Sequence, residues 1–151
     1  MGSHYDGNAR EVRALDTFIK LSRAAETIAD RLEPGLREAG LTGKQLGVLE
    51  MLWHLGSLCQ HEIGEKLLMS RANITLIVRQ LDRENLVRRE RVKEDRRYVR
   101  VSLTGEGRRR IARIFPGHVS RIVEAMAPLS RREQAELGRL CRKLGLGLSS
   151  P

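Results

Sequence analysis

The sequence of 151 residues predicts a mainly α-helical fold that carries one small β-hairpin, or β-wing. Apolar residues recur at three- to four-residue steps through most of the chain, which is the period of amphipathic helices. Two β-prone runs, residues 86–91 and 98–103, flank a charged turn and are typical of a hairpin. Positive charge gathers here, because residues 71–110 hold 13 basic side chains against 6 acidic ones in a chain of net charge +9.

The first helix is expected within residues 1–40. Val12, Leu15, Ile19 and Ile28 follow its apolar period, and Pro34-Gly35 is expected to end it. Its apolar face is wider than a single stripe, which indicates burial against more than one neighbour. Residues 1–40 are therefore predicted to be an N-terminal dimerisation helix.

A second helix should begin at Thr42, because Thr42 and Gln45 form a capping box, and it should stop at Gly56. A short link, Ser57–Gln60, leads to a third helix over residues 61–68. Met69-Ser70 is then read as a turn. Two short helices joined in this way are typical of a helix-turn-helix.

The fourth helix starts after Ser70, a good N-cap, and Ile74, Val78 and Leu81 recur at the spacing of an inward face. Small, amide and arginine side chains on the opposite face suit a helix that reads bases in the major groove. An ordinary solvated helix face is the alternative. The candidate DNA-binding residues of this recognition helix are Ser70, Arg71, Ala72, Asn73, Thr75, Leu76, Arg79 and Gln80.

The hairpin should carry a cationic tip that enters the minor groove while the helix lies in the major groove. Asp95 is expected to orient a neighbouring arginine by a charge-assisted hydrogen bond rather than to touch DNA. Residues 41–104 are thus predicted as a winged helix-turn-helix DNA-binding domain. The candidate DNA-binding residues of the wing are Arg89, Arg91, Lys93, Asp95, Arg96 and Arg97.

Residues 105–151 are predicted to be C-terminal dimerisation helices. Thr104 caps a long helix that Pro116 should kink without ending, since the apolar pattern resumes after it. A capping box at Ser130 and Glu133 opens the last helix. Pairing the apolar faces of these helices across a two-fold axis would bury them and separate two wings to match two half-sites.

The composition and the motifs indicate which kinds of partner and function to expect. Aromatic residues make up only 3%, which favours double-stranded DNA over stacked single strands. The sequence has no apolar run long enough for a membrane span and no signal peptide, so we expect a cytoplasmic protein without a membrane partner. Phosphate-loop, nucleophile-elbow and zinc-protease motifs are missing, and the histidines lie at no metal-ligand spacing, so no enzyme, cofactor or metal is expected. The alternative from another functional class is a protein-interaction module, in which the winged helix contacts only other proteins.

Five motifs follow one another along the chain: Leu41-Thr42 with Gln45, Ser70-Arg71, Leu86-Val87-Arg88-Arg89, Asp95-Arg96-Arg97 and Val101-Ser102-Leu103-Thr104 with Gly107. In these motifs the chain resembles the MarR family of bacterial transcription regulators, over residues 41–145. The resemblance implies a homodimeric winged-helix protein that binds a pseudo-palindromic operator, usually as a repressor released by a small molecule or by oxidation. It also implies that Asn73 and Thr75 are base-reading residues and Arg97 the wing-tip arginine.

Two mechanisms by which the protein could be released from its operator stay open. A cleft is expected where the second helix joins the dimerisation and DNA-binding parts, and Met51, Trp53 and His54 are its candidate lining residues for a small-molecule effector, expected to be aromatic or phenolic. Cys59 is the candidate for redox sensing, although a buried inert thiol is the better interpretation.

Overall fold

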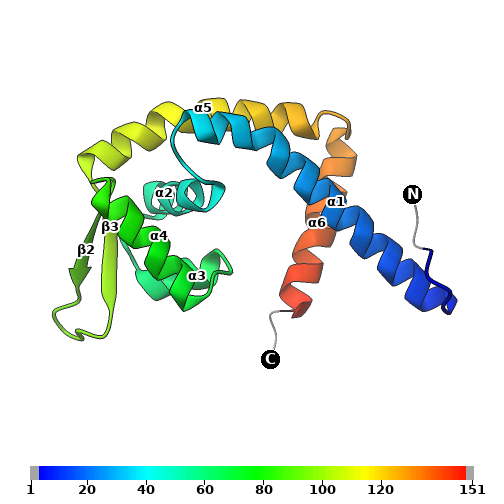
Figure 1. Ribbon diagram of the computed structural model, residues 1–151, viewed down its shortest axis with the longest axis horizontal. Helices are drawn as coiled ribbons and strands as arrows, with labels where there is room; N and C mark the ends of the chain where they lie inside the picture. Colours follow the sequence, from blue (N-terminus) through cyan, green and yellow to red (C-terminus); the bar gives the residue numbers. More distant parts are fainter. Residues whose placement is uncertain (1–3, 149–151) are drawn as a thin grey trace. The chain divides into compact units, whose positions relative to one another are not determined.

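The computed structural model describes residues 4–148 and confirms the mainly helical class with a small antiparallel sheet (Figure 1). The chain divides into two compact units: residues up to Arg31 together with those from Val119 onward, and Leu32–His118. We call them the terminal unit and the central unit. The elements are α1 (Ala9–Glu38), α2 (Gly43–Leu55), β1 (Leu58–Cys59), α3 (Gln60–Lys66), α4 (Arg71–Arg83), β2 (Val87–Arg91), β3 (Val99–Leu103), α5 (Gly105–Met126) and α6 (Arg131–Leu148).

The core of the chain lies in the central unit. Leu49 of α2, Ile63 of α3, Val78 of α4 and Val101 of β3 are fully buried together, so the two helices of the helix-turn-helix and the wing share one hydrophobic cluster. Burial of such side chains stabilises the folded state by about 1.5–3 kcal/mol each. The recognition helix is therefore held rigidly against the sheet.

The wing is the antiparallel hairpin of β2 and β3, with Val87 opposite Leu103 and Arg91 opposite Val99. The predicted hairpin is confirmed. The expected link at Ser57–Gln60 is corrected in part, because Leu58 and Cys59 form the edge strand β1, in which Leu58 pairs with Val101. A two-residue strand leaves no period in the sequence, and this one exists only because β3 offers it a free edge.

The expectation that Pro34-Gly35 ends the first helix is wrong. The helix continues to Glu38 and closes at Gly40, whose positive φ lets the Gly40 amide donate to the Arg37 carbonyl and the Leu41 amide to the Leu36 carbonyl. Pro34 removes only one helical hydrogen bond. Burial of Leu36 in the core stabilises the last turn and explains why the helix continues past the proline.

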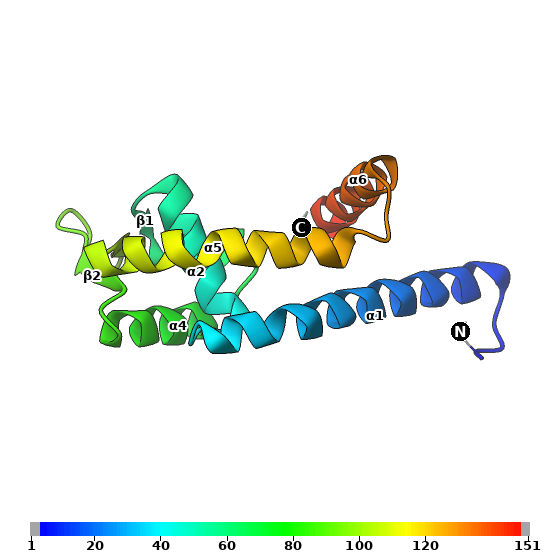
Figure 2. The ribbon, with the colours of Figure 1, turned by 90° about the horizontal axis from the view of Figure 1, so that it is seen from above.

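The other predicted helix starts are confirmed to within one residue, although α3 spans Gln60–Lys66 where residues 61–68 were expected. The capping box of α2 has both of its hydrogen bonds, since the Thr42 amide donates to Gln45 Oε1 at 2.8 Å and the Gln45 amide to Thr42 Oγ1 at 3.2 Å. At the start of α6 the Ser130 amide likewise donates to Glu133 Oε2, at 2.8 Å. Helix α5 continues past Pro116 to Met126, and Figure 2 shows α5 as one continuous helix.

The terminal unit leaves apolar side chains exposed. Every residue of α6 is exposed, including Leu137, Leu140 and Leu144, which follow one another at helical spacing. Phe18 of α1 and Val123 of α5 are exposed as well. Large apolar faces of this kind usually belong to an interface. Across residues 4–148, no helix is both long and apolar enough to cross a membrane.

Candidate nucleic-acid interface

Helix α4 presents a buried face and an exposed face. Ser70 caps it, as predicted, because Ser70 Oγ accepts from the Asn73 amide at 3.2 Å. The predicted inward residues Ile74, Val78 and Leu81 are buried, together with Ile77. The predicted candidates Ser70, Arg71, Ala72, Asn73, Leu76, Arg79 and Gln80 are all exposed on the remaining surface.

Thr75 is the exception among the predicted readers. It is only half-exposed, and its hydroxyl donates to the Arg71 carbonyl at 2.7 Å while accepting from Gln60 Nε2 at 2.8 Å. Its single hydroxyl proton is therefore already used. Gln60 was not predicted from the sequence, because a contact between α3 and α4 does not change the apolar period of either helix.

The wing tip is braced by Asp95 and Arg97. Arg97 Nε donates to Asp95 Oδ1 at 3.0 Å, Arg97 Nη2 donates to Asp95 Oδ2 at 2.6 Å, and the Arg97 amide donates to Asp95 Oδ1 at 3.0 Å. The predicted orienting contact is thus present. Hydrogen bonds from the Arg97 side chain, and then from its amide, lower the pKa of the Asp95 carboxyl, and the same contact raises the pKa of Arg97.

This bracing leaves the arginine accessible. The side chain of Arg97 is 84% exposed, whereas that of Asp95 is 32% exposed. Two of the five guanidinium N–H groups face the carboxylate through Nε and Nη2, so Nη1 and the outer edge of the group remain for another acceptor. The loop therefore offers an oriented cation at its end.

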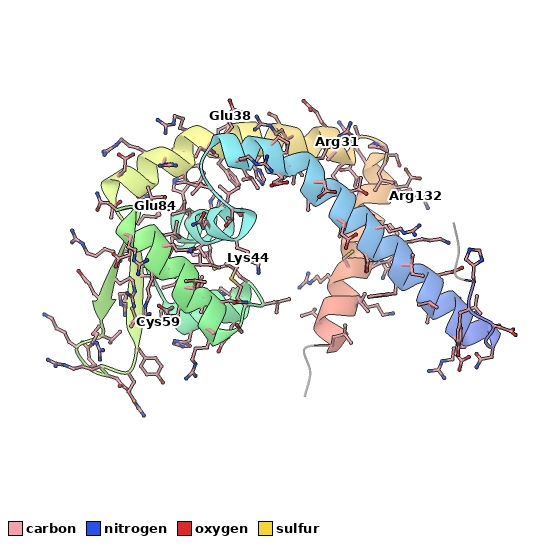
Figure 3. The ribbon with its side chains drawn as sticks, in the orientation of Figure 1. Arg31, Glu38, Lys44, Cys59, Glu84 and Arg132 are labelled. Carbon is pink, nitrogen blue, oxygen red and sulfur yellow. The ribbon has the colours of Figure 1, made fainter. Side chains whose placement is uncertain are left out.

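The other wing candidates divide into two groups. Lys93 and Arg96 are exposed, and Arg91, also exposed, donates to the Arg96 carbonyl at 3.3 Å across the loop. Figure 3 shows side chains ending in nitrogen around this hairpin. Arg89 differs, because its side chain is only 25% exposed and lies 4.0 Å from Asp82 of α4. Its Nε is buried without a hydrogen-bond partner in the part of the chain that the structure describes.

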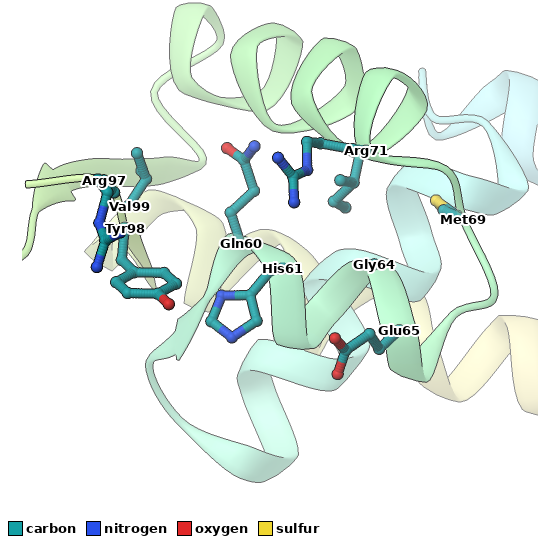
Figure 4. A pocket seen from close by; sticks show the side chains of 10 residues that line it. Gln60, His61, Gly64, Glu65, Met69, Arg71, Arg97, Tyr98 and Val99 are labelled. Atoms are coloured by element: carbon teal, nitrogen blue, oxygen red, sulfur yellow. The ribbon is translucent and has the colours of Figure 1, made fainter.

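A cavity of about 440 Å³ separates the wing from the start of α4. Arg71 of α4 and Arg97 of the wing both line it, as do His61 and Tyr98, whose rings are tilted at 46° to each other with centroids 5.0 Å apart (Figure 4). Two cations on the margins of one concavity suit a strand of phosphates passing between a major-groove and a minor-groove contact. A second cavity, of about 240 Å³, lies on the wing and is lined by residues 90–94 and Arg100.

The predicted effector residues lie in an aromatic cluster of the central unit. The ring centroid of Trp53 lies 5.0 Å from that of His54 and 5.7 Å from that of Phe115 on α5. Met51 packs against the hydrophobic core of the central unit, as do Trp53 and Phe115. Phe115 was not predicted as an effector residue, because its place in the apolar period of α5 is that of any core position. Neither of the two cavities described above is lined by these residues.

Cys59 is half-buried on β1, where its amide donates to Glu62 Oε2 at 2.7 Å, while Cys141 is exposed on α6. Among residues 4–148, no three His, Cys, Asp or Glu side chains gather in a way that could hold a metal ion.

Comparison with known proteins gives a consistent result. Residues 41–99 match the model of the MarR family. The chain is 32% identical to the HTH-type transcriptional regulator MhqR of Bacillus subtilis over 134 residues, which cover 89% of this chain and 92% of the relative. It is also 31% identical to the uncharacterized HTH-type transcriptional regulator YkoM of the same organism, with 92% of this chain and 91% of the relative covered.

Solved structures agree with this relationship. The structure of Sco3205, a MarR family transcriptional regulator from Streptomyces coelicolor in complex with DNA, is similar with a TM-score of 0.86 and 26% identity, covering 98% of this chain and 94% of that one. A probable transcriptional regulator from Pseudomonas aeruginosa follows the same fold with a TM-score of 0.77 and 30% identity, covering 83% of this chain and 94% of that one. The relatives are transcription regulators and not enzymes, and they share the winged helix described above. Because of the match to the family model and these relatives, the chain belongs to the MarR family of DNA-binding transcription regulators.

Proposed function

We propose that the protein is a repressor that binds a pseudo-palindromic operator as a homodimer and releases it when a small aromatic or phenolic effector binds. The observation that carries the DNA-binding half is the pair of accessible groups on one domain: the exposed face of α4 and the Arg97 guanidinium held by Asp95. A protein-interaction module would need neither a base-reading face nor an oriented cation at the wing. A regulator acting on chromosomal DNA would work in the cytoplasm.

The homodimer is supported by the terminal unit. A stripe of leucines on α6, with Phe18 of α1 and Val123 of α5, is exposed in the single chain. Burying such a stripe against a second copy would be favourable, and a two-fold axis would match the symmetry of a pseudo-palindrome. Residues 1–40 and 105–151 are therefore proposed as dimerisation segments flanking the DNA-binding segment 41–104.

The effector is supported by the Trp53, His54 and Phe115 cluster. Aromatic rings favour stacked or edge-on partners, and Trp53 already meets Phe115 edge-on at an interplanar angle of 79°. An aromatic ligand entering this cluster would weaken DNA binding only if it bound the free arrangement more tightly than the DNA-bound one. Oxidation of Cys59 is the rival route of release.

Selection from random duplexes tests the operator. We expect an inverted repeat to be enriched and two chains to bind each duplex, and we expect transcription of the adjoining gene to rise when the regulator is deleted. Enrichment of no sequence, or of an unrepeated site bound by one chain, would show that the proposed mode of binding is wrong.

Titration of phenolic acids tests release. Trp53 is the sole tryptophan, so its fluorescence should change as the ligand binds, and operator affinity should fall over the same concentration range. Quenching without a change in operator affinity would mean that the cluster binds ligands without regulating. Loss of DNA binding in mild peroxide, in wild type but not in Cys59→Ser, would favour the redox route instead.

A further inference from the structure

The centre of the exposed face of α4 is apolar. Ala72 and Leu76 are one helical turn apart, so they lie on the same stripe of the helix, opposite the buried Ile74 and Val78. Leu76 is 57% exposed. A leucine left in water at the middle of a base-reading face has apolar area whose burial on binding would be favourable.

Thr75 contributes its methyl group to this apolar centre, because its hydroxyl is not free to donate a hydrogen bond. Its hydroxyl is held by the Arg71 carbonyl at 2.7 Å and by Gln60 Nε2 at 2.8 Å. Donation to a base would require breaking the first of these bonds. Between Asn73 and Arg79, α4 therefore offers methyl and methylene groups to a duplex, and hydrogen-bonding readers stand only on either side.

The charges around this patch favour DNA over a protein partner. Arg71 and Arg79 are exposed beside it on the same helix. Cationic margins around an apolar centre complement a major groove, in which phosphates line the edges and the C5-methyl group of thymine projects from the floor.

We propose that Leu76, together with Ala72, reads the C5-methyl group of a pyrimidine in the major groove, so that the operator is selected in part through thymine methyl groups. This rests on the proposed function, since it requires α4 to lie in the major groove of a specific site. The same methyl group is carried by 5-methylcytosine.

The experiment uses the full-length protein and the operator enriched from random duplexes. Each thymine is replaced in turn by uracil, which keeps the base-pairing and major-groove oxygen and removes only the methyl group. At one thymine in each half-site, binding should weaken by about fourfold for each methyl removed, as expected for loss of one buried methyl-sized group. Two further operators carry either cytosine or 5-methylcytosine at that position, and their affinities are compared. Tighter binding of the methylated operator extends the methyl readout to both pyrimidines, whereas equal binding restricts it to thymine.

Two variants connect the effect to the side chain. Leu76→Ala should lose most of the discrimination between the thymine and uracil operators, with only the Ala72 contact remaining. Leu55→Ala removes a leucine that is 56% exposed on α2, away from the reading face, and should discriminate as wild type does. Because both leucines are exposed, both variants should keep the wild-type melting temperature.

The proposal is overturned if uracil at every thymine leaves affinity unchanged, or if Leu76→Ala keeps the full discrimination. If no sequence is enriched at all, the proposed function fails and the methyl readout fails with it. Sequence-specific binding that ignores the methyl groups removes the methyl readout alone.

Discussion

The acidic residue at the wing tip is the most informative single residue of the interface. A carboxylate close to DNA should repel it, yet Asp95 holds the Arg97 guanidinium by three side-chain hydrogen bonds and also accepts from the Arg97 amide. If orientation matters more than charge, the acid stabilises the complex through Arg97. If charge matters more, the acid weakens it.

Asp95→Asn separates these effects. Asparagine can still accept from the Arg97 amide but no longer carries the charge that pairs with the guanidinium. We expect weaker binding to duplex DNA, measured by fluorescence anisotropy, although a negative charge has been removed. Glu94→Gln, an exposed acid in the same loop, is the control and should bind as well as wild type or better. Tighter binding by Asp95→Asn would contradict the orienting role.

The lowered pKa of Asp95 gives a second test at this residue. Because the folded pKa lies below that of an unfolded aspartate, the pairing is complete above the ordinary carboxyl pKa and is lost only as pH falls through the lowered one. An NMR titration of the Asp95 carboxyl carbon should therefore show a higher pKa in Arg97→Ala than in wild type. Equal values in the two proteins would mean that the guanidinium does not hold the carboxylate.

At the scale of elements, the wing is fastened to the end of α4 by the start of α5. Thr104 Oγ1 donates to the Asn85 carbonyl at 2.6 Å and accepts from the Gly107 amide at 2.9 Å. Gly107 allows this close approach, because a Cβ there would lie 1.9 Å from the Leu86 carbonyl oxygen. The exit from the wing is thus packed directly on its entrance.

Gly107→Ala should destabilise the central unit by at least about 2 kcal/mol, since backbone must move to admit the methyl group. Urea unfolding followed through Trp53 measures this. Gly47→Ala on α2 is the matched control: its Cβ would meet Leu67 Cδ2 at an ordinary 3.7 Å, so it should be neutral or stabilising by up to about 1 kcal/mol. Equal stability of the two variants would show that the approach at Gly107 is not constrained.

Local patterns predicted the elements well where one short segment holds both partners. The capping boxes at Thr42 and Ser130 and the N-cap at Ser70 follow from residues three positions apart. Strand β1 could not be predicted in this way, since its partner β3 lies far along the chain. The hydroxyl of Thr75 depends likewise on Gln60 from another helix.

The inward direction of the Arg89 side chain could have been predicted from the alternation of residues along its strand. Alternation along a strand puts Arg89 on the same face as the buried Val87, and its register partner Val101 is buried too. Its direction toward α4 and Asp82 follows from that period, whereas an assignment by charge alone placed it with the DNA-binding residues.

At the scale of the whole molecule, the proposed dimer depends on the apolar stripe of α6. Leu140→Glu with Leu144→Glu places two charges on it, and burying them against a second copy would be costly. We expect the double variant to sediment as a monomer and to bind a full inverted repeat more weakly than wild type. Deletion of the segment after Ser130 should leave a monomeric or unfolded protein.

Arg142→Glu is the control for added negative charge, because Arg142 is exposed on α6 away from the leucine stripe. It should remain a dimer. A double variant that stayed dimeric, or a folded monomer that bound the full repeat with wild-type affinity, would show that this stripe does not set the spacing of the half-sites.

Helix α4 is proposed to read sequence while the wing supplies a sequence-independent anchor. Affinities for the operator and for random duplexes, measured across a salt series, distinguish these two roles. Asn73→Ala should lose about 1–3 kcal/mol on the operator and little on random DNA. Arg97→Ala should weaken binding to both duplexes and lower the salt slope by about one unit. If both variants lose the same affinity on both duplexes, the division between reader and anchor is wrong.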